Sequence, residues 1–124
     1  MVTLVTNNPL AQEQFRGEIL TEYMEISLLG VLIRVRDHVH GGSQLLTHPL
    51  SGSVKPNETP YKSVLVSETQ GKADPKSVHI IEECILTAKK FPIKHIPEKF
   101  LPDLQIVDLA LIQGACDSFQ TPHI

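Results

Sequence analysis

The first half of the chain alternates short β-branched runs with helical repeats, and this alternation is the feature that most constrains the fold. Val2 to Thr6 is a strand-like run that stops at the sequence NNP. There Asn8 suits a helix N-cap and Pro9 suits the first helical position. The helix that this predicts ends at about Arg16, just before Gly17. The first strand is therefore expected to lead directly into the first helix.

The same alternation continues to residue 48. Thr21 to Ile26 alternates polar and apolar side chains imperfectly, as a second strand would. Ser27 can cap a second helix, whose apolar positions recur at helical spacing until Gly41-Gly42 ends it. Gln44 to His48 is the third predicted strand. The order strand, helix, strand, helix, strand favours parallel pairing through right-handed crossovers, which is half of a doubly wound sheet.

The second half of the chain predicts one more strand and two helices. Lys62 to Glu68 is a fourth strand whose direction the sequence leaves open, although the lack of a crossover helix before it favours antiparallel pairing at an edge. Asp74-Pro75 opens a helix to about Phe91, and a proline-rich linker separates it from a last helix over Pro102 to Ser118. We therefore predict one α/β domain over residues 1–124. It has three layers and a small, mostly parallel sheet (β-α-β-α-β, then an edge strand), followed by two C-terminal helices.

Composition excludes several function classes. The chain has 124 residues, of which 41% are apolar and 20% charged, so it can bury a core without a disulfide or a metal. No run approaches the ~20 apolar residues of a membrane span, and the N-terminus lacks the basic leader of a signal peptide. The net charge of -3 and the few aromatic residues argue against a nucleic-acid partner. We expect a cytoplasmic protein.

The two cysteines carry no recognisable chemistry. Cys84 and Cys116 both fall in predicted helices among apolar residues, and neither belongs to a CxxC motif or a Cys/His cluster. They are expected to be buried, reduced thiols. His38 and His40 are two residues apart on a predicted helix and diverge by about 200° around its axis, so they are expected to lie on the surface and not to share a metal. The sequence predicts no metal site and no cofactor.

The last predicted helix is apolar on more than one face. The apolar side chains that the sheet alone cannot cover have two interpretations. They contact a second copy of the chain, or they are buried because the helix lies between the sheet and the linker. In the first interpretation, the protein is a homo-oligomer assembled through this helix. The stripe expected to face the sheet is Leu104, Val107 and Leu111, and the side expected to face a second copy is Ile106, Leu109 and Ala110.

Residues 47–61 form the segment that could carry chemistry. Long loops without regular structure are uncommon in small domains, and three prolines restrict this one. The loop leaves the predicted third strand at the sheet edge where the NNP sequence leaves the first, and ligands of open α/β sheets bind in that crevice. A helix N-terminus and a lysine there favour a small anionic ligand. The candidate ligand-binding residues are Asn7, Asn8, His48, Ser51, Ser53 and Lys55.

The alternative interpretation of the loop is structural: a proline-restricted segment that covers a sheet edge against pairing with another chain. His48 is the first candidate for a general acid or base, because it ends a strand in the crevice and titrates near neutral pH. Hydrogen bonding within the loop is the commoner role for such a residue. No GxSxG, GxGxxG or Walker sequence occurs, so the sequence does not decide whether the protein is an enzyme.

Two segments of the chain resemble the GrdX-like family. They are TNNP at residues 6–9 and THPLSGSVKPNETPYKS at 47–63, and RVRDHVHGG between them is also similar, so that the resemblance covers at least residues 2–66. It implies an association with glycine, sarcosine or betaine reductase, selenium-dependent systems of amino-acid-fermenting anaerobes. Reduced thiols suit an anaerobic cytoplasm. The resemblance supplies no activity, cofactor or catalytic residue.

Three functions are therefore compatible with the sequence. The chain has neither selenocysteine nor a CxxC pair, which favours an accessory or regulatory protein that docks to the reductase complex or senses a small anionic metabolite. The alternative is a small enzyme that acts on such a metabolite, with His48 as general acid or base and Lys55 holding negative charge. The third is a purely structural oligomer.

Overall fold

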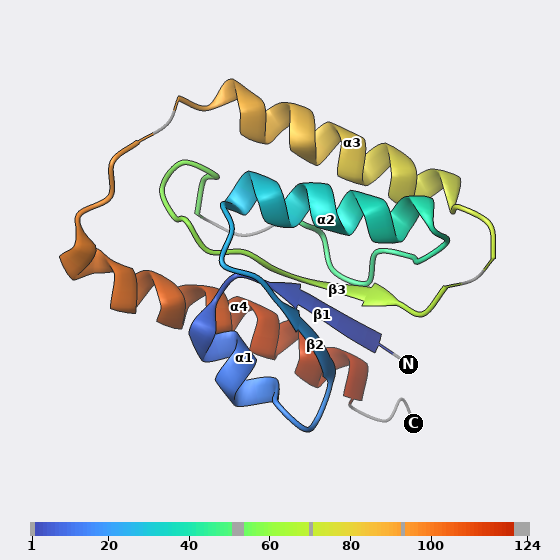
Figure 1. Cartoon of the computed structure of the whole chain (residues 1–124), viewed down its shortest axis with the longest axis horizontal. Coiled ribbons are helices and arrows are strands. Elements are labelled where there is room, and N and C mark those ends of the chain that lie inside the picture. The colour runs from blue at the N-terminus through green and yellow to red at the C-terminus, as the bar shows by residue number, and fades with distance from the viewer. Residues whose placement is uncertain (1, 51–53, 70, 93, 121–124) are drawn as a thin grey trace.

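The strands form a mixed sheet between two pairs of helices (Figure 1). A computed structural model of the protein describes residues 2–50, 54–69, 71–92 and 94–120, the side chains of residues 119 and 120 excepted. In these ranges the sheet has three strands in the order β2-β1-β3. They are β1 (Val2–Thr6), β2 (Leu20–Tyr23) and β3 (Ser63–Ser67). β2 runs parallel to β1 and β3 antiparallel to it, with Val5 opposite Glu22 on one side and Val64 on the other.

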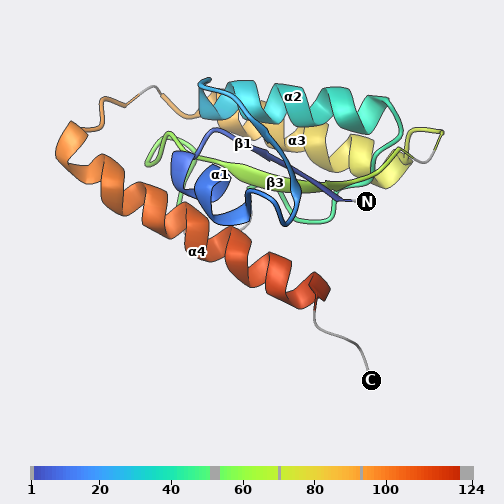
Figure 2. The ribbon, with the colours of Figure 1, turned by 60° about the horizontal axis from the view of Figure 1, so that its bottom comes forward.

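The helices make the fold three-layered, as the sequence predicted. α2 (Leu28–His40) and α3 (Pro75–Lys90) cover one face of the sheet, and α1 (Pro9–Phe15) and α4 (Leu101–Gln120) cover the other (Figures 1 and 2). A single 3-10 turn, η1 (Glu98–Phe100), precedes α4. The α/β class and the two C-terminal helices are confirmed. No helix of the described chain is long and apolar enough to cross a membrane.

Local sequence signals explain where the helices begin and end. The side chains of Asn8, Ser27 and Asp74 each accept a backbone N–H of the following turn at 3.0 Å, which satisfies donors that have no partner within the helix. Gly17 follows α1 with a φ of 85°, and Gly42 follows α2 with a φ of 109°. Residues with a side chain rarely adopt these left-handed conformations, so glycine is favoured there.

Successive residues of β1 point to opposite faces of the sheet and separate two apolar clusters. Val5 joins the cluster under α2 and α3, and Leu4 joins the cluster under α1 and α4. The first cluster also contains Val31, Val35, Val39, Val64, Val66, Ile81 and Ile85, and the second contains Ala11, Phe15, Leu65, Ile112 and Cys116.

The predicted third strand over Gln44 to His48 is wrong. Leu45 forms only an isolated antiparallel bridge with Val66, and the Thr47 hydroxyl replaces a backbone acceptor for the Leu65 N–H at 3.1 Å. β3 lies between this segment and β1, because its aliphatic side chains are buried on both faces. The sheet is consequently mixed and not mostly parallel, while the antiparallel, edge-side pairing expected for the fourth strand is confirmed.

α4 is rotated relative to the prediction. Its buried residues are Asp108, Ile112 and Cys116, whereas Val107 and Leu111 of the stripe expected to face the sheet are exposed. The physical reason is the Asp108 carboxylate, whose buried hydrogen bonds determine which side of α4 faces the sheet.

Candidate functional site

A buried polar cluster joins β1, the N-cap of α1, β3 and α4. We define it as Thr6, Asn8, Ser63 and Asp108, all of which are buried. Asp108 Oδ2 accepts hydrogen bonds from Asn8 Nδ2 at 2.9 Å and from Ser63 Oγ at 2.7 Å. Because the Ser63 hydroxyl donates to the carboxylate, it accepts from the Thr6 hydroxyl at 2.7 Å. Thr6 in turn accepts the Asn8 backbone N–H at 3.0 Å. The chain of donors ends on a negative charge, an arrangement in which each bond strengthens the next.

A cavity of about 110 Å3, which we call the Lys62 cavity, borders this cluster. Lys62 immediately precedes β3, and the Asn7 side chain fixes its backbone by accepting its N–H at 2.8 Å. The residue is only 8% exposed, although it carries a flexible charged side chain. The cavity is lined by Thr47, His48, Lys62, Ser63, Asp108, Leu111, Ile112 and Ala115.

The electrostatics of the cavity are set by two opposite charges. Burial lowers the pKa of Lys62, and the negative charge of Asp108 opposes that shift. Within the described ranges the Lys62 ammonium forms neither a hydrogen bond nor an ion pair. A desolvated ammonium without a partner is unfavourable, so the cavity favours either loss of the Lys62 proton or the arrival of a negative group.

A second hollow, of about 750 Å3, lies where the parallel strands β1 and β2 end, and we call it the carboxyl-edge pocket. Burial raises the pKa of Tyr23 there, and the charges of Glu25 and Tyr61 add to the rise. Asn7 also lines this pocket, but its Nδ2 already donates to the carbonyls of Ile26 and Pro60, both at 2.8 Å. Open α/β sheets bind ligands at this location. In this pocket, however, the polar groups that could contact a ligand are spread along an open surface.

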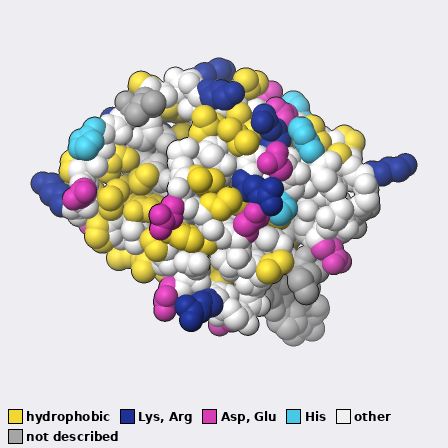
Figure 3. Space-filling model, viewed as in Figure 1, with side chains coloured by type: hydrophobic (Ala, Val, Ile, Leu, Met, Phe, Trp, Pro, Cys, Tyr) yellow, Lys and Arg dark blue, Asp and Glu magenta, His cyan; other side chains and the backbone are white. Residues whose placement is uncertain are grey.

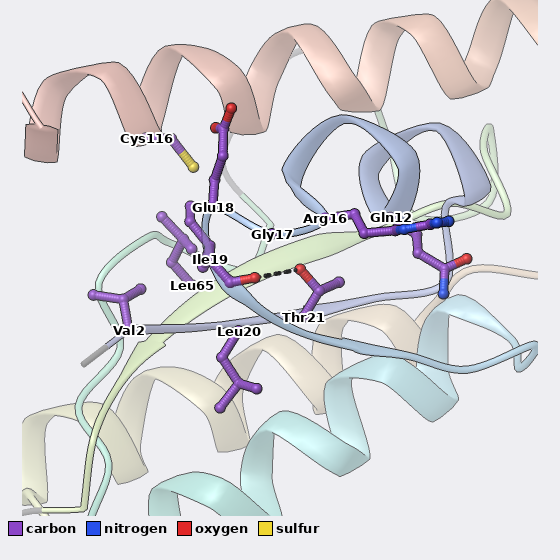
Figure 4. A pocket seen from close by; sticks show the side chains of 10 residues that line it. All are labelled: Val2, Gln12, Arg16, Gly17, Glu18, Ile19, Leu20, Thr21, Leu65 and Cys116. Atoms are coloured by element: carbon purple, nitrogen blue, oxygen red, sulfur yellow. Dashed lines mark hydrogen bonds between the residues drawn. The ribbon is translucent and has the colours of Figure 1, made fainter.

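A third hollow, of about 730 Å3, lies at the opposite end of the same strands (Figure 4). Its lining includes Arg16 and Glu18 around the turn from α1 to β2, and Cys116 from α4. Burial raises the pKa of the Cys116 thiol to about 11, with the charges of Asp117 and Glu18 contributing. The thiol is therefore protonated at neutral pH and is no nucleophile. Cys84 is likewise buried and free, so the predicted burial of both thiols is confirmed.

The predicted ligand-binding residues fall in different places. Asn8 belongs to the polar cluster, and His48 lines the Lys62 cavity while its Nδ1 accepts the Leu50 N–H at 3.1 Å. Both residues therefore adjoin Asp108. Lys55 is exposed, and its backbone N–H donates to Glu58 Oε1 at 3.3 Å.

Asn7 lines the carboxyl-edge pocket and not the Lys62 cavity. Ser51 and Ser53 lie outside the described residues. The binding role of the six residues stays a prediction.

Sequence reasoning missed Lys62 and Asp108, the two charges of the cavity. A signal for Asp108 was present, because it is a lone acid inside the apolar run IVDLALI of a predicted helix. Lys62 gave a weaker signal as a charge next to a fully buried strand. Lysine and aspartate are rarely buried without a partner. Once the fold is known, the burial of both at one cavity therefore marks that cavity as a candidate site. In the described part of the chain, no three His, Cys, Asp or Glu side chains are grouped as a metal would require.

The family model described as GrdX-like protein matches residues 3–117. No curated protein and no solved structure matches the chain.

Proposed function

Since this chain belongs to the GrdX-like family, we propose that it is an accessory binding protein of a glycine reductase-type system, sensing a small metabolite that carries negative charge. The family supports the association with such systems. The binding site in this proposal is the Lys62 cavity. The observation that carries the proposal is Lys62: the residue is only 8% exposed and lines a cavity, and its ammonium has no partner among the described residues.

Three features of the cavity support a small anionic guest. A carboxylate or phosphate would replace the hydration that the Lys62 ammonium loses on burial, through a charge-assisted hydrogen bond. The Thr47 hydroxyl lines the same space, and because its oxygen accepts the Leu65 N–H, its own proton can be donated to an oxyanion. The volume of about 110 Å3 corresponds to three or four water molecules at ~30 Å3 each, which limits the guest to a compact metabolite.

Thermal unfolding with added acetate, phosphate or acetyl phosphate tests the proposal. A guest at 100 times its dissociation constant adds about 2.7 kcal/mol to the free energy of unfolding. We expect Lys62→Met to abolish the increase and Lys76→Met, which removes an exposed lysine of α3, to leave it unchanged. Equal ligand effects in the wild type and Lys62→Met would place binding elsewhere, and no effect of any small anion would contradict the proposal.

A small enzyme is the second candidate function, and the position of His48 favours it. His48 lines the same cavity as Lys62 and Asp108, so an imidazole, a lysine with a lowered pKa and a carboxylate surround one space. In this case His48→Ala should abolish turnover of a bound metabolite while leaving its binding within a few-fold. Binding without turnover by the wild type would favour the sensor.

The accessory role also includes assembly through α4. Phe100, Ile106, Val107 and Leu111 expose large apolar side chains, and Figure 3 shows hydrophobic surface on the side of the molecule where α4 begins. We propose that this surface contacts a second copy or a component of the reductase complex. Leu109 packs partly against the core, so Ile106, at 57% exposure, is the better position to test. Sedimentation should show an oligomer at micromolar concentration that Ile106→Asp dissociates, and a wild-type monomer would contradict self-assembly.

A further inference from the structure

The two oxygens of the Asp108 carboxylate differ in whether they accept hydrogen bonds from the surrounding fold. Oδ2 accepts both hydrogen bonds that the side chain receives from described residues, those of Asn8 and Ser63. Oδ1 receives none from the described residues. Asp108 is also a lining residue of the Lys62 cavity. A carboxylate oriented in this way can accept a further donor from a guest without giving up its structural role.

The same cavity presents the opposite charge through Lys62. Both residues are more than nine-tenths buried, at 6% exposure for Asp108 and 8% for Lys62, and in the described structure they form no ion pair with each other. Two opposite charges that border a cavity without pairing with each other are left to solvent or to a guest. A guest that pairs with only one of them leaves the other unpaired.

We propose that the Lys62 cavity selects a small zwitterion, whose carboxylate pairs with Lys62 and whose ammonium donates to Asp108. This inference rests on the proposed function and names the guest that the cavity would bind. A simple monoanion would face repulsion from Asp108, and a simple amine would face repulsion from Lys62. A zwitterion satisfies both charges and leaves the total charge of the site unchanged, so the two residues reject the wrong guests as well as attracting the right one.

The walls of the cavity add a limit on size. Leu111, Ile112 and Ala115 of α4 supply apolar lining opposite the polar groups. At about 110 Å3, the cavity fits the smallest amino acids better than those with long side chains. The inference therefore concerns compact amino acids and not amino acids in general.

Isothermal titration calorimetry with three probes of the same size class tests the inference: glycine, acetate and methylammonium. For the wild type we expect glycine to bind at least tenfold more tightly than either fragment. Asp108→Asn keeps an acceptor oxygen for Asn8 and Ser63. It should reduce the affinity for glycine to the affinity for acetate. Lys62→Met should abolish binding of both glycine and acetate. The matched control is Asp103→Asn, which neutralises an exposed acid of α4 and should change nothing.

The outcomes separate the two proposals. Acetate binding as tight as that of glycine would overturn the zwitterion while leaving a small-anion sensor in place. No binding of glycine or of any small anion would overturn both. The comparison of probes needs only the wild-type protein, so it remains decisive if Asp108→Asn fails to fold. Leucine is the size probe, and binding as tight as that of glycine would overturn the size limit.

Discussion

The sheet face under α2 and α3 is packed with aliphatic side chains, whereas the face under α1 and α4 also buries a carboxylate and its donors. Val5, Val64 and Ile81 represent the first face, and Asn8 and Asp108 the second. The difference arises from both the strands and the helices, because Thr6 of β1 and Ser63 of β3 meet Asp108 of α4 on the second face. Burial of aliphatic side chains stabilises a face without closely fixing the rotation of the helices packed on it. A buried polar cluster fixes that rotation, and on this face the cluster also borders the Lys62 cavity.

The largest expected effect comes from the aliphatic face. Ile81 is fully buried between α3 and the sheet, and Ile81→Ala should lower the free energy of unfolding by about 2 to 5 kcal/mol, through lost burial and the cavity left behind. Urea denaturation measures the change. The control on the same helix is Leu86→Ala, at an exposed position, which should change stability by about 0.5 kcal/mol or less. Equal effects at the two positions would contradict the assignment of this face as the core.

A smaller effect is expected from the polar cluster. Asp108→Ala leaves the Asn8 amide and the Ser63 hydroxyl without their acceptor, and should lower the free energy of unfolding by about 1 to 3 kcal/mol. Asp108→Asn retains an acceptor and should lose less. Denaturation curves of both variants give the comparison. If Asp108→Ala were as stable as the wild type, the cluster would not hold α4 in place.

The smallest effect concerns the ion pairs that Glu22 of β2 forms with Arg34 and His38 of α2. Burial raises the pKa of Glu22 on β2, but hydrogen bonds and positive charge from His38 and Arg34 outweigh it, and the net pKa lies below the ordinary value of 4.5. Because the folded pKa is the lower one, the stabilisation is complete above the unfolded pKa and is lost as pH falls through the folded pKa. The group is well solvated, so the effect should be about 0.5 kcal/mol or less.

The measurement is the stability difference between the wild type and Glu22→Gln at pH 6 and at pH 3. It should shrink at the lower pH, as pH falls toward the lowered pKa of Glu22. Glu13→Gln, at an exposed position of α1, is the control and should show a smaller pH dependence. A Glu22 difference that is the same at both pH values would show that its charge adds nothing to stability.

Signals that act within a few residues could be recognised in the sequence alone. The caps at Asn8, Ser27 and Asp74, the glycine after α2 and the buried strand β1 each depend on neighbouring residues, so the helices and the α/β class followed directly. His48, from the loop that begins at residue 47, lines the Lys62 cavity and not the carboxyl-edge pocket, so the binding role expected for this loop stays a prediction. The ligand itself stays a prediction.

Only the tertiary structure decided what depends on pairing between distant segments. The aliphatic β3 pairs with β1, whereas residues 44–48, predicted as the third strand, form only an isolated bridge on the other side of β3, because strand order follows from burial on both faces of the sheet and not from chain order. Asp108 determined the rotation of α4 through two bonds to residues 45 and 100 positions away, which no local hydrophobic pattern encodes. The same contacts place Asp108 beside Lys62, so the charges of the candidate site exist only in the folded chain.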